Sequence, residues 1–492
     1  MTRTLLPIAL CGLATAAAAA DRPNILLILT DDQGWPTLGC YGNRLVPTPN
    51  LDRLAAEGMR FTDAYVLPQC TPTRAALLTG QHSARNRMWH VIPWYGYPHA
   101  AVREPAFVEN LPASGFNLAK GLRAAGYATA CIGKWHLTHD ADGDYSGLRA
   151  ASAGKFGFDH APPPAPKADF AEGGDRGVDR LTDDTLAFIE KNRSRPFFAY
   201  LAHHTLHGKV VAPERLVRKH LAAGRPAQGL HNATYLAAIE HLDDSVGRLM
   251  KRLDDLGLRD KTLVVFLSDN GGVHVQHDPA PFQKDPAPGE SLPTRLTEKA
   301  REFDNAPLRA GKGSAYEGGI RVPMIVRWPG RVKPGSASGT PVHVVDLLPT
   351  LLEAAGGAAP ADHPVDGVSL LPLLTGSGGP PERALFWHLP LYDVRWGLTP
   401  CAVIRRGDHK LIEHFGDRFD AEGRYVVGRH VELFDLRNDI GETRNLAAEQ
   451  PELAARLLAE LHAHIRSAGS EIPGANPDHD PRRSLRETKR RP

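Results

Sequence analysis

The sequence lacks the features that would mark a nucleic-acid-binding or membrane-spanning protein. Its 58 Lys and Arg residues are nearly balanced by 56 Asp and Glu residues, so the formal net charge is only +2. A charge this small creates no overall positive field that would favour nucleic acid. Beyond the first twenty positions, no apolar run approaches the ~20 residues that a membrane-spanning helix needs. Attraction for an anionic ligand would therefore have to come from a local cluster of cations.

Cysteine is also scarce, because the 492 residues include only Cys11, Cys40, Cys70, Cys131 and Cys401. So few cysteines exclude a disulfide-dense scaffold. If Cys11 is removed with an N-terminal signal and Cys70 has a chemical role, three remain and at least one of them is unpaired. The sequence leaves open whether Cys40, Cys131 and Cys401 form any disulfide.

The N-terminus has the pattern of an export signal. Arg3 precedes the apolar run Leu5–Ala20, and Ala18-Ala19-Ala20 before Asp21 is a small-residue cleavage site. We therefore predict that residues 1–20 are a cleaved signal peptide and that the mature chain is exported, either to a periplasm or to the outside. A lipoprotein signal ending at Cys11 is the alternative, which the large Leu10 before it disfavours.

The periodicity of the chain predicts an α/β fold. Short apolar segments predict buried strands at Asn24–Thr30, Tyr127–Ile132, Pro196–Ala202, Thr262–Ser268 and Val322–Trp328. Helical patterns lie between or after them, at Asn117–Ala125, Ala233–Leu256 and Val344–Ala355. Strands that are apolar on both faces and alternate with helices indicate a mostly parallel sheet sandwiched by helices.

The character of the sequence changes near Arg383, where the segments become shorter and more polar. We therefore predict a main domain over residues 21–382 and a smaller C-terminal α+β subdomain over residues 383–470. A helical pattern at about Pro451–Ala468 closes this subdomain. Residues 471–492 are polar and end in a basic cluster, which predicts a solvated, disordered tail.

Polar side chains follow four of the predicted strands at the points where they end. These are Asp31-Asp32, Lys134-Trp135-His136, His203 to His207, and Asp269-Asn270. In open α/β sheets ligands bind beyond the carboxyl ends of the strands, so these groups are expected to converge. Three carboxylates and an amide oxygen suit a hard cation such as calcium. The lysine and the histidines suit an anion and proton transfer.

A further segment, from Pro68 to Gly80, predicts a short helix beginning near Cys70. Pro72 suits the first turn, and Gly80 suits the end of the helix. Cys70 then lies at the helix N-terminus, where free N–H groups and the helix dipole favour anions. Arg74, one turn later, would place a cation near it. Without further information Cys70 could equally be a buried structural cysteine.

These motifs together resemble the formylglycine-dependent (type I) sulfatases, the arylsulfatase family of the alkaline-phosphatase-like superfamily. The signature C-x-P-x-R stands at Cys70 to Arg74, and a second signature stands at Gly126 to His136. The calcium motifs of the family match Asp31-Asp32 and Asp269-Asn270-Gly271, and its lysine motif matches Gly311-Lys312-Gly313. The resemblance runs in order from about Arg22 to Leu446.

The resemblance implies a mechanism for these positions. Cys70 would be oxidised to formylglycine (3-oxoalanine) by a formylglycine-generating enzyme, and its hydrate would attack sulfur. One calcium ion would be held by Asp31, Asp32, Asp269, Asn270 and the modified Cys70. Arg74, Lys134 and Lys312 would stabilise charge on the sulfate. His207, with Lys312, would protonate the leaving alcohol, and His136 would take the proton that lets sulfate leave.

The sequence departs from the family pattern at the proposed acid. The family usually has P-H-x-P there, whereas Leu206 precedes His207 and Gly208-Lys209 follow it. His203 and His204 lie close enough in the sequence to compete for the role.

The resemblance implies a sulfuric ester hydrolase, and we expect its substrate to be a sulfated carbohydrate. A phosphate or phosphonate ester hydrolase on the same scaffold is one alternative, and a non-catalytic anion- or sugar-binding relative is another. A cysteine rather than serine or threonine at position 70 favours sulfate. No residue identifies the sugar, the position of its sulfate, endo or exo action, or the oligomeric state.

The first testable prediction concerns Cys70. A chain produced together with a sulfatase-maturing enzyme should yield a tryptic peptide that lacks the Cys70 thiol and carries an aldehyde. Mass spectrometry and a hydrazide probe would detect that aldehyde. An active preparation in which Cys70 is fully alkylatable would contradict the mechanism.

Overall fold

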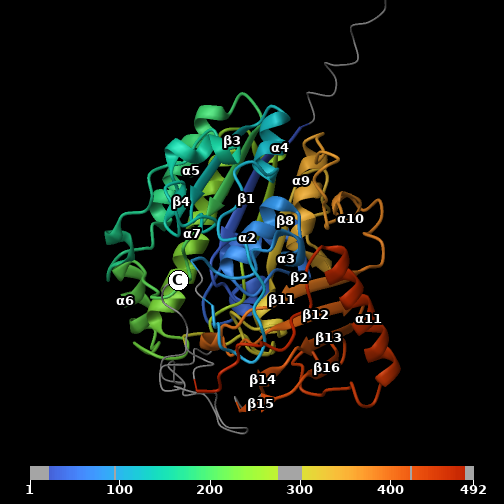
Figure 1. Ribbon diagram of the computed structural model, residues 1–492. Coiled ribbons are helices and arrows are strands. Elements are labelled where there is room, and N and C mark those ends of the chain that lie inside the picture. The colour runs from blue at the N-terminus through green and yellow to red at the C-terminus, as the bar shows by residue number, and fades with distance from the viewer. Residues whose placement is uncertain (1–21, 94–95, 275–301, 421–423, 483–492) are drawn as a thin grey trace, which may run out of the picture.

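A computed structural model describes residues 22–93, 96–274, 302–420 and 424–482 (Figure 1). The predicted signal peptide, residues 1–20, lies outside this part of the chain. The main sheet has eight strands, and seven of them follow the spatial order β10-β2-β8-β7-β1-β6-β3, with β9 also paired to β2. Their bounds are β1 Asn24–Thr30, β2 Met59–Tyr65, β3 Ala128–Gly133, β6 Phe197–Ala202, β7 Thr262–Ser268, β8 Arg321–Arg327, β9 Ser336–Ser338 and β10 Val342–His343.

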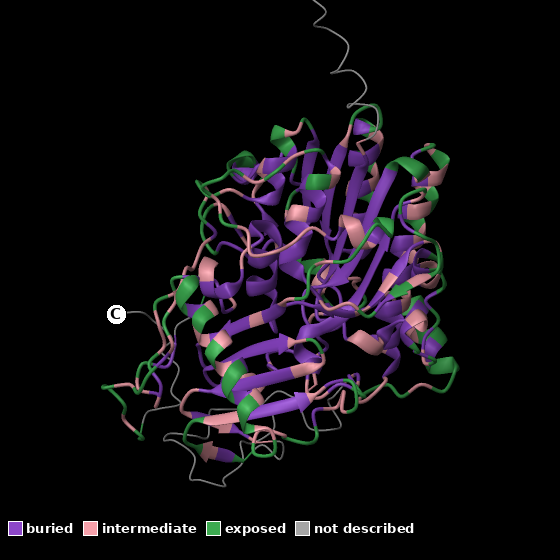
Figure 2. Ribbon diagram, turned by 90° about the vertical axis from the view of Figure 1, so that its right-hand side faces the viewer, coloured by how far each residue is buried: buried purple, intermediate pink, exposed green. Residues whose placement is uncertain are grey.

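The central strand β1 shows why its sequence is apolar at nearly every position. Ile25, Leu27 and Leu29 belong to the core on one face of the sheet, whereas Leu26 and Ile28 belong to the core on the other. Successive side chains of a strand point to opposite faces, so a strand covered on both sides must be apolar throughout. Figure 2 shows the strands of the main sheet buried along their length.

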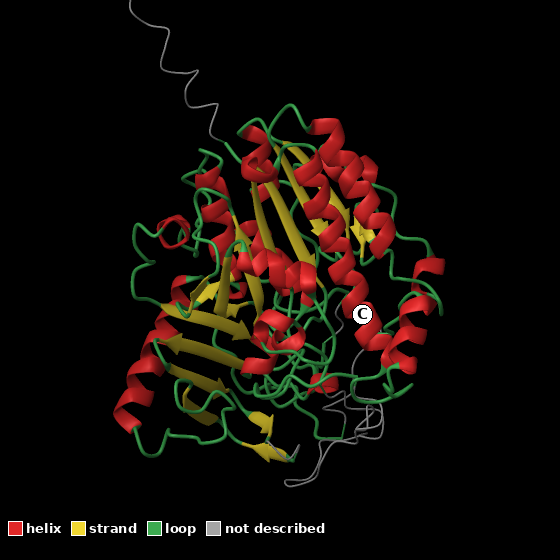
Figure 3. Ribbon diagram, turned by 180° about the vertical axis from the view of Figure 1, so that it is seen from behind, coloured by secondary structure: helices red, strands yellow, loops and turns green. Residues whose placement is uncertain are grey.

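Helices cover both faces of this sheet (Figure 3). One layer packs on the core that contains Leu27, and its helices are α2 Cys70–Thr79, α4 Leu118–Ala124 and α9 Leu347–Ala354. The other layer packs on the core that contains Leu26, and its helices are α1 Pro49–Ala56, α5 Val178–Asn192 and α7 Ala233–Asp255. Shorter helices are α3 Ser83–Asn86, α6 Glu214–Ala222, α8 Glu317–Ile320 and α10 Leu371–Thr375.

The mostly parallel α/β sheet predicted from the sequence is confirmed, with one local exception. Strands β7, β1, β6 and β3 are parallel, but β8 runs antiparallel to both β7 and β2. Strand β2 was not predicted, because Thr62 and Asp63 interrupt its apolar pattern. The order of strands and the direction of β8 depend on long-range pairing, which periodicity does not report.

Glycine residues follow two of the predicted helices, and one of them, Gly80, was expected there. Gly80 follows α2 with φ +67°, and Gly257 follows α7 with φ +65°. Glycine adopts this left-handed conformation without the Cβ clash that other residues meet there. At the start of α4, the Asn117 side chain accepts a hydrogen bond from the Lys120 N–H at 3.0 Å.

The C-terminal part forms a separate antiparallel sheet in the order β11-β12-β13-β16. Its strands are β11 Ala384–Leu389, β12 Cys401–Arg406, β13 His409–His414 and β16 His430–Asp435, and helix α11 Pro451–Ser467 packs on one face of it. Two-stranded pieces are β4 Gly143–Asp144 with β5 Gly147–Leu148, and β14 Asp417–Phe419 with β15 Tyr425–Val427. None of the helices in the described ranges is long and apolar enough to cross a membrane.

The start of the predicted tail is ordered by contacts that the sequence did not reveal. Ala475 pairs with Val102, and the Asn476 side chain donates hydrogen bonds to the backbone oxygens of Pro98 and Ala100. The expectation of a disordered tail is therefore wrong for this stretch, because polar side chains there bond to a neighbouring loop. The basic end of the tail, residues 483–492, lies outside the described residues.

A buried ionic cluster joins the two sheets. The Lys410 ammonium of β13 lies 3.0 Å from Glu317 of α8 and 2.8 Å from Glu442, and all three side chains are fully buried. Glu317 also accepts a hydrogen bond from the Tyr65 hydroxyl of β2 at 2.6 Å. A buried charge is costly unless it is paired, so this cluster fixes the C-terminal sheet against the main domain.

We predict that Lys410→Met destabilises the protein strongly. The change leaves Glu442 buried without its cation and leaves Glu317 with only Arg321, 3.2 Å away. Breaking a buried ion pair in this way costs about 3–5 kcal/mol. Thermal and denaturant unfolding would measure the loss. Lys251→Met is the matched control, because Lys251 pairs with Asp255 on an exposed helix surface and such changes shift stability by about 0.5 kcal/mol or less. Equal stabilities of the two variants would contradict the role of the cluster.

Candidate functional site

The predicted convergence of polar strand ends is confirmed. Strands β7, β1, β6 and β3 are consecutive neighbours in the sheet and all run in the same direction. Their carboxyl ends therefore lie at one edge. Asp269-Asn270, Asp31-Asp32, His203 and Lys134 each follow directly after one of these strands.

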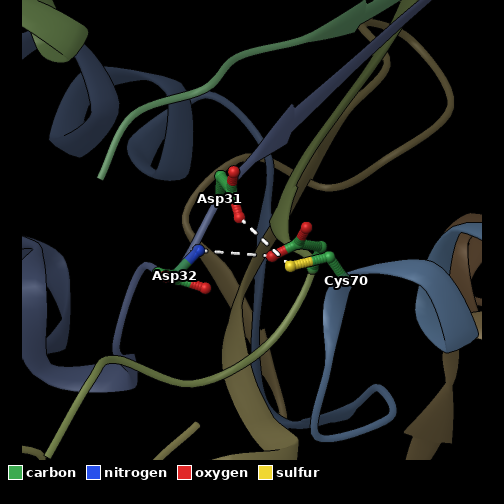
Figure 4. Close-up of side chains that lie close together, drawn as sticks. Asp31, Asp32 and Cys70 are labelled. Carbon is green, nitrogen blue, oxygen red and sulfur yellow. Dashed lines mark hydrogen bonds between the residues drawn. The ribbon is translucent and has the colours of Figure 1, made fainter. Parts of the chain in front are cut away.

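Three carboxylates and a thiol meet at this edge. Ligand atoms of Asp31, Asp32, Asp269 and Cys70 all lie within 4.8 Å of one another. Figure 4 shows the Asp31 carboxylate and the Cys70 thiol pointing toward each other, and the sulfur lies 3.5 Å from Asp31 Oδ1. All four side chains are at most 2% exposed. Such a buried group of acids needs positive charge nearby to remain ionised.

Three buried cations provide that charge, one for each carboxylate. Arg74 Nη2 lies 2.6 Å from Asp269, and Lys134 Nζ lies 2.6 Å from Asp31. Lys312 Nζ lies 2.8 Å from Asp32. Arg74 also donates a hydrogen bond to the backbone oxygen of Lys134 at 3.0 Å. The three cations therefore balance the three carboxylates within the site itself, in a molecule whose formal net charge is only +2.

The pKa values of the carboxyl groups follow from burial and from these partners. Burial raises the pKa of Asp269 to about 6, and the charge of Asp31 adds to that rise. Burial would also raise the pKa of Asp31, but Lys134 and other nearby cations outweigh it and hold that pKa well below its usual value. Burial raises the pKa of Asp32, although Lys312 opposes the rise.

The acidic group suits a hard divalent cation. Oxygen ligands dominate the set, as calcium prefers. Asn270 adds an oxygen, because its Nδ2 donates to Asp32 at 2.8 Å while its buried Oδ1 has no hydrogen-bond partner among the described residues. A buried acceptor of this kind is costly unless a ligand satisfies it.

Cys70 is the first residue of α2, as expected, and Arg74 projects from the next turn toward the same cluster. Burial raises the pKa of the Cys70 thiol to about 12, even though Lys134 and Lys312 oppose the rise. The unmodified side chain is therefore a neutral thiol at pH 7, and a thiol is a far weaker nucleophile than a thiolate.

Two histidines lie at the site, and each contacts a backbone oxygen through a different ring nitrogen. The His136 Nε2 lies 3.1 Å from the backbone oxygen of Ile92, whereas its buried Nδ1 has no partner in the described structure. The His207 Nδ1 lies 2.9 Å from the backbone oxygen of Gly208. A carbonyl oxygen only accepts, so His136 carries its proton on Nε2 and His207 on Nδ1. The other nitrogen of each ring can exchange a proton with a ligand.

The competing histidines are placed differently. His203 points toward helix α7, where its Nε2 lies 3.5 Å from the Ser245 hydroxyl. His204 is fully buried, with its ring 5.3 Å from that of Tyr145. Of the three, only His207 lines the pocket.

A pocket of about 640 Å³ opens over the cluster. Predicted site residues in its wall are Asp32, Cys70, His136, His207 and Lys312. The sequence did not single out several others, namely Tyr145, Tyr235, Glu302, Arg395 and Trp396. They come from loops and helices far apart in the chain, and none belongs to a local motif that could have revealed it.

Two site residues adopt a backbone conformation that is uncommon for their type. Asp32 has φ +57° and His136 has φ +54°. Non-glycine residues in this left-handed region are sparse and cluster at functional sites. In both cases the residue stands just past the end of a strand, where the chain must turn its side chain into the pocket.

Comparison with known proteins identifies the family. A model described as Sulfatase matches residues 23–358, and a model described as N-sulphoglucosamine sulphohydrolase, C-terminal, matches residues 311–470. Arylsulfatase A of Homo sapiens is 32% identical over 93% of this chain and 91% of its own length. N-acetylgalactosamine-6-sulfatase of Homo sapiens is 33% identical over 91% of this chain and 87% of its own length.

Solved structures share the fold. The crystal structure of Ps i-CgsB in complex with k-i-k-neocarrahexaose has a TM-score of 0.68 at 25% identity, covering 90% of this chain and 93% of that chain. The phosphonate monoester hydrolase SpPMH from Silicibacter pomeroyi has a TM-score of 0.63 at 22% identity, covering 91% of this chain and 96% of that one. At that identity the second likeness concerns the fold alone.

These findings confirm the resemblance and the alkaline-phosphatase-like fold inferred from the motifs. The Sulfatase match spans most of the chain, and relatives above 30% identity align with about nine-tenths of it. The chain therefore belongs to the sulfatase family and is a sulfuric ester hydrolase.

Proposed function

We propose that the protein removes sulfate from a carbohydrate, with formylglycine made from Cys70 as nucleophile and one calcium ion as cofactor. The observation that carries this proposal is the position of Cys70. It starts α2, lines the pocket and lies against three buried carboxylates and the lysines that neutralise them.

The state of the thiol supports the need for modification. A neutral thiol with a pKa of about 12 would leave the site without an effective nucleophile at pH 7. Oxidation of Cys70 by a formylglycine-generating enzyme replaces sulfur with an aldehyde, whose hydrate carries two hydroxyl groups. That enzyme is the partner that we propose for maturation, and export through the predicted signal peptide would accompany it.

Asp31, Asp32, Asp269 and Asn270 would hold the calcium ion together with the modified Cys70. A bound calcium ion supplies positive charge toward the sulfate oxygens and toward the nucleophile. The buried Asn270 Oδ1 without a partner in the described ranges supports this assignment, as does the oxygen-rich donor set.

The three cations of the site would bind and orient the sulfate. Lys134 and Lys312 each place an ammonium beside a carboxylate of the cluster, and Lys312 lines the pocket. Arg74 is held rigidly by two hydrogen bonds to Asp269 and one to the Lys134 backbone. Fixed donors aimed at developing negative charge contribute roughly 3–4 kcal/mol each to catalysis.

The histidines would move protons at the two nitrogens that are free. His207 Nε2 would deliver a proton to the leaving alcohol, and His136 Nδ1 would accept the proton whose loss lets sulfate depart. Burial, reinforced by Lys312, holds the pKa of His207 well below its usual value. A bound sulfate ester brings negative charge, which raises that pKa and favours the protonated acid.

The relatives and the pocket support a carbohydrate substrate. One relative is named for the sulfate of N-acetylgalactosamine, and one solved neighbour was crystallised with a neocarrahexaose. A pocket of about 640 Å³ has room for a saccharide, and Trp396 and Tyr235 supply aromatic surface. A panel of sulfated mono- and oligosaccharides, with a phosphonate monoester beside them, would identify the substrate. Faster turnover of the phosphonate would favour the alternative hydrolase.

We predict that calcium removal lowers both activity and melting temperature. At a calcium concentration about 100 times Kd, the bound ion stabilises the fold by about 2.7 kcal/mol. Chelation followed by calorimetry and metal analysis would measure the loss, and added calcium should restore it. Asp269→Ala should abolish the calcium-dependent shift.

Asp179→Asn is the control for the calcium experiment. Asp175, Asp179 and His241 also bring their ligand atoms within 4.8 Å of one another, but Asp179 is exposed and already paired with Arg248 at 2.9 Å. The calcium-dependent shift should be unchanged in this variant. If Asp269→Ala keeps its metal content and rate, the assignment of the ion is wrong.

We predict that His207→Ala slows hydrolysis of a sugar sulfate by about 10²–10⁴-fold, the usual contribution of a general acid. The loss should be much smaller for nitrophenyl sulfate, because a nitrophenolate leaves without protonation. His136→Ala should slow both substrates alike, because it acts after the alcohol has left. Steady-state rates on the two substrates would measure the difference.

His203→Ala and His204→Ala complete the comparison of the histidines. Neither side chain lines the pocket, so neither variant should show the dependence on leaving group. If His204→Ala shows that dependence and His207→Ala does not, the acid has been assigned to the wrong histidine.

A further inference from the structure

Tyr145 lies at the centre of the proton-transfer groups. It stands between β4 and β5, in a hairpin tied to the site by a 3.0 Å hydrogen bond from the His136 N–H to the Asp144 backbone oxygen. Its ring lies 5.3 Å from that of His136 and 5.2 Å from that of His207. The Lys134 ammonium stacks over the same ring at 4.4 Å. The position of this one ring therefore limits where both histidines can lie.

Arg176 holds this ring and the loop that carries His207. It stands in the turn before α5, and its side chain is almost fully buried. Its Nη2 donates a hydrogen bond to the Tyr145 hydroxyl at 3.0 Å. Its Nε donates to the backbone oxygen of His204 at 3.1 Å, and its Nη1 donates to that of Lys209 at 2.7 Å.

The two backbone contacts lie on either side of His207. The segment from His204 to Lys209 follows β6 and lacks the proline residues that usually flank this histidine in the family. Each proline would have restricted the backbone at its own position. Here a planar guanidinium spans both ends of the segment, which a lysine could not do because its ammonium lacks that fork.

The charge of Arg176 is not explained by an ion pair. Among the described residues no carboxylate forms a salt bridge with Arg176, and its hydrogen bonds go to neutral oxygens. Its guanidinium stacks over Phe170 at 5.0 Å. Burying an unpaired cation is costly. The function of Arg176 must therefore lie in its contacts with neutral groups.

We propose that Arg176 is a positioning residue, which acts through Tyr145 and through the His204–Lys209 segment to hold His207 in place for proton transfer. This inference rests on the proposed function, because it assigns Arg176 to the same reaction. Arg176 does not line the pocket, so its effect reaches the substrate only through these groups.

The experiment compares Arg176→Gln, Arg176→Lys and Tyr145→Phe on a sugar sulfate and on nitrophenyl sulfate, in the calcium-loaded, modified enzyme. Arg176→Gln should lower kcat for the sugar sulfate by about 10²-fold, the cost of misplacing a catalytic group by about 1 Å. The loss for nitrophenyl sulfate should be below about tenfold, since that substrate does not need the acid. Arg176→Lys keeps the charge but not the fork, so it should restore little. Tyr145→Phe keeps the ring and should lose less than Arg176→Gln.

A double-mutant cycle separates positioning from general damage. If Arg176 acts through His207, Arg176→Gln should add almost nothing to the rate loss in the His207→Ala background. Arg180→Gln is the control, because Arg180 lies in the first turn of α5, just after Arg176, but contacts the partly exposed Asp169 and Asp184. Its rates should match those of the unchanged enzyme, and melting temperatures would report the folding of every variant.

The outcomes distinguish the two proposals. Additive losses in the cycle, equal losses on both substrates, or full rescue by Arg176→Lys would overturn the positioning role. If the unchanged enzyme turns over no sulfate ester, the proposed function fails instead. If His207→Ala shows no dependence on the leaving group, the assignment of the acid is wrong and the positioning role of Arg176 fails with it.

Discussion

The structure depends on a local balance between three buried carboxylates and three buried cations. Asp31, Asp32 and Asp269 are nearly inaccessible to solvent, and each is paired with Lys134, Lys312 or Arg74. Removing one partner would leave an uncompensated charge in a dry interior, at a cost of about 3–5 kcal/mol. The surrounding fold must therefore deliver all six side chains together, and this requirement explains much of its architecture.

The sheet meets this requirement through strand order. Asp269, Asp31 and Lys134 follow β7, β1 and β3, parallel strands whose carboxyl ends lie at one edge. Arg74 arrives from α2, whose first residue, Cys70, lies at that edge. Lys312 arrives from a loop that packs beside β7 through a hydrogen bond from its N–H to the Gly272 oxygen. Close packing leaves no room for side chains at some of these contacts. A Cβ on Gly271 would lie 1.7 Å from the Gly318 oxygen, so only glycine fits there.

The smaller C-terminal sheet contributes to the same edge indirectly. Glu317 of α8 follows shortly after Lys312 and is held by Lys410 of the second sheet. Trp396, from a loop between β11 and β12, faces the Lys312 ammonium at 5.5 Å. The C-terminal part therefore supports the lysine segment and supplies part of the pocket wall. The two family matches overlap at residues 311–358, the stretch that contains both Lys312 and Glu317.

The sequence by itself determined the fold class, the family and most of the residues gathered at the site. Strands such as Asn24–Thr30 are recognisable because burial on both faces demands an unbroken apolar run, and the motif at Cys70 to Arg74 is local. Only the tertiary structure decided which of the neighbouring histidines lines the pocket. His203, His204 and His207 are close in the sequence, but their directions depend on how the segment after β6 leaves the sheet. The structure alone also brought Tyr145 and Arg176 to the site. Their contacts join segments that are far apart in the chain, and a hydrogen bond to a distant backbone oxygen cannot be predicted from a short-range sequence pattern.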